Sequence, residues 1–174
     1  EKRLEAWAAI AESNLDLPIF RNLLRAPPSG VNPINEFLEI QKPNSNIKPC
    51  SVAIAEDEAF HFRYLETREC LEALGIELIP WSPLKDESIP LEAKGLIIPG
   101  GFPEQYAEQL SECSKSLEDL RVFFGKKPIY AECGGMLLLG KSITDLYGNV
   151  HAMTKLLPFH ARKGNLQVGY RSIH

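Results

Sequence analysis

Cys133 is the residue whose surroundings most clearly indicate chemistry. It follows a short apolar run at residues 128–131, and two glycines and a second apolar run at residues 136–139 come after it. Small residues beside a nucleophile are typical of a strand–nucleophile–helix turn, where the backbone bends sharply and packs closely. A cysteine at such a turn lies near a helix N-terminus, whose partial positive charge favours the reactive thiolate. The segment predicts covalent acyl transfer at Cys133, with a buried structural thiol as the alternative interpretation.

A second glycine pair, Gly100 and Gly101, follows another apolar run at residues 95–99. Attack on an amide needs backbone N–H donors for the developing oxyanion as well as a nucleophile. Gly101 and Gly134 can each present such an N–H with no side chain beside it. Taken alone, the first pair would be an ordinary turn. Together with the Cys133 turn, it favours a catalytic site.

The elements that must position these turns alternate between apolar runs and helical patterns. Strands are expected near residues 51–55, 76–80, 95–99, 128–132 and 166–171, and helices near residues 65–74, 104–124 and 135–139. This alternation predicts an α/β fold with an open, mostly parallel sheet and helices on both faces. The carboxyl ends of parallel strands share one edge of the sheet. The loops at residues 56–62 and 99–104 should therefore meet Cys133 there.

The first 49 residues are predicted to be a separate part of the chain. Residues 1–26 have the pattern of two helices, with Asp16 as the cap of the second and Pro18 in its first turn. Residues 27–49 are rich in proline, asparagine and serine, which predicts a linker. The two helices are expected to be the tail of a preceding domain, and the globular domain to span residues 50–174.

Composition excludes several other classes of protein. The chain has 19 basic and 23 acidic residues, a net charge of −4 and no basic block, which disfavours binding to nucleic acid. No apolar run approaches the roughly 20 residues that a membrane-spanning helix needs. The N-terminus lacks the apolar segment of a signal peptide, and the four cysteines form no C-x-x-C pair. We therefore expect a cytoplasmic protein with no metal ligands in this chain.

Three segments together resemble a known family. They are Ala-Glu-Cys-Gly-Gly at residues 131–135, Pro-Gly-Gly-Phe-Pro-Glu at residues 99–104, and the segment at residues 57–64 that begins Asp-Glu-Ala-Phe. These segments resemble the glutamine amidotransferase domain of cobyrinic acid a,c-diamide synthases. Ser-Pro-Leu at residues 82–84 and Gly-Tyr-Arg at residues 169–171 are similar too. The resemblance covers about residues 50–174, and the N-terminal helices resemble the tail of the family's ATP-dependent synthetase domain.

The resemblance implies a flavodoxin-like, class I glutamine amidotransferase fold and a specific reaction. Cys133 would form a glutamyl thioester, while Gly101 and Gly134 would stabilise the oxyanion. The loop that contains Asp57 and Phe60 would lie near the substrate or the synthetase interface. The released ammonia would amidate the a and c carboxylates of a corrinoid, cobyrinic acid, in cobalamin biosynthesis. ATP and Mg²⁺ would act in a synthetase domain outside this chain.

The sequence differs from the family pattern in two ways. The family's catalytic histidine lies in a Gly-His-Glu-Phe-His-like motif beyond Gly-Tyr-Arg, and none of His61, His151, His160 and His174 occupies such a motif. We therefore assign no base, and we expect His151 and His160 to lie in an irregular, solvent-exposed stretch. No G-x-x-x-x-G-K-[ST] loop is present, which is consistent with an incomplete fragment that binds no ATP. Two alternatives stay open: an amidase domain for another tetrapyrrole, similar to cobyric acid synthase, or a non-catalytic amidotransferase-like domain.

Overall fold

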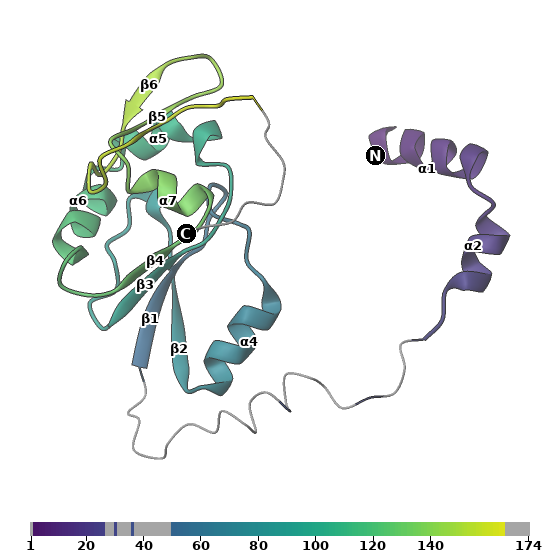
Figure 1. Cartoon of the computed structure of the whole chain (residues 1–174), viewed down its shortest axis with the longest axis horizontal. Coiled ribbons are helices and arrows are strands. Elements are labelled where there is room, and N and C mark those ends of the chain that lie inside the picture. Colours follow the sequence, from purple (N-terminus) through teal and green to yellow (C-terminus); the bar gives the residue numbers. More distant parts are fainter. Residues whose placement is uncertain (1, 27–29, 31–35, 37–49, 166–174) are drawn as a thin grey trace, which may run out of the picture. The chain divides into compact units, whose positions relative to one another are not determined.

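Two N-terminal helices form a unit of their own in the computed structural model, which describes residues 2–26, 30, 36 and 50–165 (Figure 1). They are α1 (Lys2–Asn14) and α2 (Leu17–Leu23). The predicted cap is confirmed, because Asp16 Oδ1 accepts a hydrogen bond from Ile19 N at 3.0 Å, and Pro18 lies in the first turn of α2. Most of the predicted linker and the whole strand predicted at residues 166–171 lie outside the described residues.

Four parallel strands form the main sheet of the second unit. In spatial order they are β2 (Ile76–Trp81), β1 (Cys50–Ala55), β3 (Gly95–Ile98) and β4 (Ile129–Ala131). Each strand was predicted from a short apolar run. The order β2-β1-β3-β4 is that of flavodoxin-like sheets, in which ligands bind outside the carboxyl ends of the strands. These ends point toward the upper part of Figure 1.

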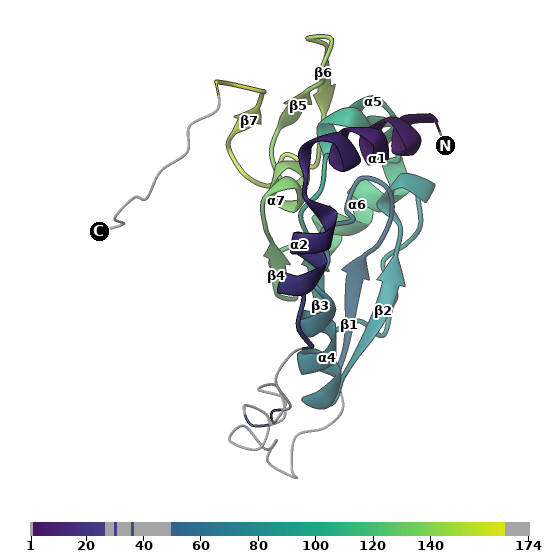
Figure 2. The same ribbon diagram turned by 90° about the vertical axis from the view of Figure 1, so that its right-hand side faces the viewer.

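Helices cover both faces of this sheet, which confirms the predicted fold class. One face carries Ala53, Leu96 and Ile98, which are fully or almost fully buried in the hydrophobic core. The elements on this side are η2 (Pro103–Gln105), α5 (Ala107–Glu112), α6 (Ser114–Phe123) and α7 (Gly134–Leu138). On the other face, α4 (Leu65–Ala73) packs beside β2 (Figures 1 and 2). None of the helices that the structure describes is long and apolar enough to cross a membrane.

A second sheet of three short strands follows α7. Its central strand β5 (Ser142–Thr144) pairs antiparallel with β6 (Val150–Ala152) and parallel with β7 (His160–Ala161). The expectation of an irregular stretch around His151 and His160 is wrong, because both residues lie in strands. His151 is also largely buried, with 14% of its side chain exposed. Strands of two or three residues are too short to show an alternating pattern in the sequence.

Asp145 holds the turn between β5 and β6. Its two carboxylate oxygens accept hydrogen bonds from the backbone N–H groups of Tyr147 and Asn149 at 2.8 Å each and from the Asn149 side chain at 3.1 Å. His151 Nε2 lies 2.9 Å from Asp145 Oδ2. The hydrogen bond with His151 is the main reason that the pKa of the Asp145 carboxyl lies well below its ordinary value. The turn is therefore fixed by a single charged side chain.

Candidate active site

Cys133 lies in a sharp turn between β4 and α7. Its backbone φ is 48° and its ψ is −118°, a left-handed conformation that a residue with a side chain rarely adopts. Its side chain is exposed. The conformation and the exposure fit the strand–nucleophile–helix turn predicted from the sequence.

The other three cysteines have different surroundings. Cys50 and Cys70 are half-buried, whereas Cys113 is buried and its thiol lies 3.2 Å from the carbonyl oxygen of Gln109. Burial is the main reason that the pKa of the Cys113 thiol is raised, and the nearby Asp86 carboxylate adds to the effect. Cys113 therefore stays protonated and inert at neutral pH. Cys133 is the one exposed thiol among the described residues.

The two glycines after Cys133 let α7 pack against the loop that follows β3. A Cβ atom on Gly134 would lie 2.6 Å from the carbonyl oxygen of Gly101, and one on Gly135 would lie 2.1 Å from that of Ile98. Both distances are far too short for a real contact between a side chain and a backbone oxygen. The glycines in the sequence are thus required by the packing that places Cys133 next to the β3 loop.

The β3 loop brings the second predicted glycine pair to the same place. A Cβ atom on Gly100 would lie 3.5 Å from the Cβ of Cys133 and 3.4 Å from that of Phe62. A Cβ atom on Gly101 would lie 2.0 Å from the carbonyl oxygen of Ala59. The loops after β1, β3 and β4 therefore meet at one edge of the sheet. Gly101 and Gly134 lie against each other beside Cys133, and their role as oxyanion donors stays a prediction.

Asp57 fixes the loop after β1. Its Oδ1 accepts hydrogen bonds from the backbone N–H groups of Ala59 at 3.0 Å and Phe60 at 3.2 Å. Its Oδ2 accepts hydrogen bonds from Leu84 N at 2.9 Å and Ser82 Oγ at 3.2 Å. Ser82 directly precedes a short helix, η1 (Pro83–Lys85), and Leu84 lies within it. The carboxylate thus ties together two segments that the sequence analysis singled out separately.

Phe60 is fully buried in the core, so its side chain supports this loop. The next two residues, His61 and Phe62, are exposed. His61, Phe62 and Phe102 form an aromatic cluster, with ring centroids 4.7 to 5.6 Å apart. Phe62 N donates a hydrogen bond to the carbonyl oxygen of Gly100 at 3.0 Å, which holds the cluster beside the β3 loop. The sequence analysis missed this cluster, because Phe102 is far from His61 and Phe62 along the chain and only the fold brings the three rings together.

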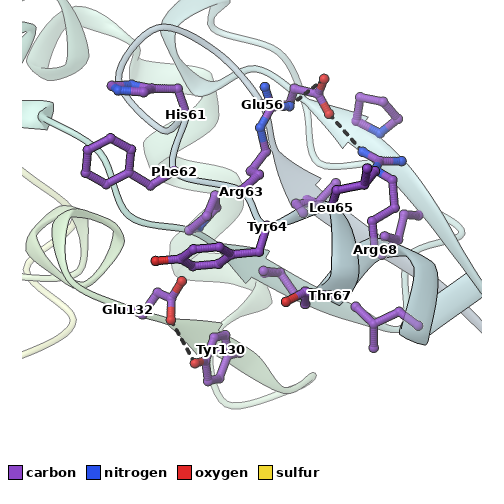
Figure 3. A pocket seen from close by; sticks show the side chains of 16 residues that line it. Glu56, His61, Phe62, Arg63, Tyr64, Leu65, Thr67, Arg68, Tyr130 and Glu132 are labelled. Atoms are coloured by element: carbon purple, nitrogen blue, oxygen red, sulfur yellow. Dashed lines mark hydrogen bonds and ion pairs between the residues drawn. The ribbon is translucent and has the colours of Figure 1, made fainter. Parts of the chain in front are cut away.

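A cleft of about 840 Å³ opens on the sheet face that α4 partly covers (Figure 3). Apolar side chains line part of it: Ile54, Leu71, Leu78, Pro80, Ile97 and Pro99. Phe62 and Glu132 also line the cleft. Because Phe62 lies beside Gly100, which in turn lies beside Cys133, this end of the cleft is next to the exposed thiol.

Two carboxylates in the cleft have different partners. Glu56 forms ion pairs with Arg63 and Arg68, the latter at 3.1 Å. Glu132 Oε2 instead accepts a hydrogen bond from the Tyr130 hydroxyl at 3.0 Å (Figure 3). This hydrogen bond, together with the charge of Glu132, raises the pKa of Tyr130. Within the described part of the chain, Glu132 has no cationic partner.

Comparison with known proteins extends this description. The chain is 40% identical over 160 residues to a cobyrinate a,c-diamide synthase from Caldanaerobacter subterraneus subsp. tengcongensis, which covers 91% of this chain and 34% of the relative. It is 37% identical over 174 residues to the synthase of the same name from Synechocystis sp., and the match covers 98% of this chain and 35% of that synthase. A hydrogenobyrinate a,c-diamide synthase from Agrobacterium fabrum is 40% identical over 124 residues, and the match covers 69% of this chain and 28% of that synthase.

The chain spans about a third of the length of these curated relatives. The sequence model of the CobB/CobQ-like glutamine amidotransferase domain matches residues 51–171, which include all three loops of the site. The parallel sheet, the turn at Cys133 and the glycines that pack around it are in keeping with this match. The chain belongs to the CobB/CobQ-like glutamine amidotransferase domain family.

Proposed function

We propose that this chain is the glutamine amidotransferase part of an ATP-dependent cobyrinate a,c-diamide synthase in cobalamin biosynthesis. The observation that carries the proposal is the exposed Cys133, held in a left-handed turn against the loop of Gly100 and Gly101. The synthases of that name that are similar over most of this chain support the choice of reaction.

The proposed reaction begins when the Cys133 thiolate attacks the carboxamide carbon of glutamine. The N–H groups of Gly101 and Gly134 stabilise the tetrahedral oxyanion by hydrogen bonds. When the intermediate collapses, the carbon–nitrogen bond breaks, and the nitrogen leaves as ammonia with the proton that the thiol gave up. Water then hydrolyses the glutamyl thioester to glutamate and restores the thiol. We assign no residue of this chain as the base that moves these protons.

The ammonia would amidate the a and c carboxylates of cobyrinic acid after ATP has activated them. No three acidic, histidine or cysteine side chains gather to hold a metal ion in residues 2–26 or 50–165. We propose that ATP and Mg²⁺ act in a synthetase domain outside this chain, because the chain spans only about a third of the length of the synthases that it resembles. The similarity to a hydrogenobyrinate a,c-diamide synthase makes hydrogenobyrinate a second candidate substrate.

Cys133→Ala in the full-length synthase that carries this domain tests the proposal. Glutamine-dependent synthesis should fall by at least about 1,000-fold, because the nucleophile is lost. Synthesis from added ammonia should be unchanged, because ammonia bypasses the glutaminase step. Cys70→Ala, at a half-buried thiol of α4, is the control and should retain both activities. Loss of both activities in the Cys133 variant, or full retention of both, would contradict the proposal.

A further inference from the structure

We propose that Glu132 binds the α-ammonium group of glutamine and so acts as a specificity residue for this substrate. The inference rests on the glutaminase function proposed above. Glu132 directly precedes Cys133, and its side chain lines the cleft together with those of Tyr64 and Tyr130 (Figure 3). The carboxylate therefore lines the cleft one residue before the nucleophile, which itself does not line it.

The position of Cys133 determines how glutamine can lie. Its thiol is exposed, and its Cβ and that of Phe62, which lines the cleft, both lie beside Gly100. A glutamine with its carboxamide carbon at the thiol can therefore extend its side chain into this end of the cleft. The α-carbon and its ammonium group then reach the part of the cleft wall to which Glu132 belongs.

The charges in the cleft indicate which group meets Glu132. Glu56, the other carboxylate, is already neutralised by Arg63 and Arg68. Among the residues that the structure describes, Glu132 has the neutral Tyr130 hydroxyl as its one side-chain partner, which leaves acceptor positions on both oxygens. A primary ammonium group offers three donors and a positive charge, and so satisfies this carboxylate.

The surroundings of Glu132 strengthen such a contact. The Tyr130 hydroxyl fixes the orientation of the carboxylate, and the apolar side chains of Ile97 and Pro99 line the same cleft. Hydrogen bonds between a carboxylate and an ammonium group are also stronger than those between neutral groups. Glutamine would therefore be distinguished from amides of similar length that carry no α-ammonium group.

Protection of Cys133 from iodoacetamide in the full-length synthase measures this contact. Mass spectrometry of the Cys133 peptide gives the glutamine concentration that halves the rate of alkylation. Glu132→Gln keeps an acceptor for Tyr130 and removes the charge, and should raise that concentration on the order of 10- to 100-fold. Glu108→Gln, at an exposed position on α5, is the matched control and should leave it unchanged.

Glutaramate, which is glutamine without the α-amino group, separates binding from structural effects. The unmodified protein should need on the order of 10- to 100-fold more glutaramate than glutamine for the same protection, whereas the Glu132→Gln protein should need similar amounts of both. Protection by glutamine that is unchanged in Glu132→Gln, or equally weakened for both amides, overturns the inference alone. If glutamine fails to protect Cys133 in the unmodified protein, the proposed glutaminase function fails and the inference fails with it.

Discussion

At the scale of single residues, Gly101 has the least space of the residues in the site. In Gly101→Ala, the new methyl group would lie 2.0 Å from the Ala59 carbonyl oxygen, so the β3 loop must move. Glutamine-dependent activity should fall by roughly 100-fold or more, because the predicted oxyanion donor is displaced. The free energy of unfolding should fall by about 1–3 kcal/mol.

Glutaminase assays and thermal unfolding check these two effects. Gly164→Ala is the control, since a Cβ atom there meets nothing within 4 Å, and it should change neither quantity. Full glutaminase activity in Gly101→Ala would show that the backbone of this loop does not stabilise the oxyanion.

Sequence reasoning could identify residues whose signals are local, and it missed roles that depend on distant contacts. Cys133 and Gly134 are consecutive residues of one short motif, so the turn that they form could be predicted without knowledge of distant contacts. The contacts of Asp57 with Ser82 and Leu84 join residues at least 25 positions apart, so its role in fixing the loop was not predictable. The role that we propose for Glu132 depends on the cleft that its side chain lines, and the sequence does not show this cleft.

At the scale of elements, the turn between β5 and β6 should depend on pH. The folded-state pKa of Asp145 is lowered, so its contribution to stability is present above the unfolded-state pKa of about 4 and is lost as pH falls below it. Asp145→Asn should therefore lower the thermal unfolding midpoint at pH 7, and this difference should shrink toward pH 3. Calorimetry of both proteins between pH 3 and 7 measures it, and parallel curves would contradict the assignment.

The presence of a local apolar run decided which strands the sequence predicted. Strands β1 and β2 have six residues each, and their apolar runs stand out. The predicted helical region at residues 104–124 became three consecutive helices, because its apolar pattern does not show where the backbone changes direction. The sheet of β5, β6 and β7 was missed, since its stability comes from pairing between segments and not from a local run.

At the scale of the whole molecule, the two tryptophans report on different units. Trp7 on α1 is 65% exposed, whereas Trp81 at the end of β2 is 1% exposed and belongs to the core. Acrylamide should quench the fluorescence of Trp7 strongly and that of Trp81 weakly. In Trp7→Phe the strongly quenched fraction should disappear. Strong quenching that persists in this variant would show that Trp81 is accessible and would contradict the described core.

The backbone at Cys133 has a consequence for how such a domain can change over time. Its left-handed conformation costs a residue with a side chain about 1–3 kcal/mol, whereas glycine adopts it freely and loses only about 0.5–1 kcal/mol of backbone entropy. A copy in which glycine replaces this cysteine would therefore become more stable and would lose the chemistry that we propose for the thiol. Natural selection on folding alone would favour that form, and the thiol would persist only while the proposed reaction is needed.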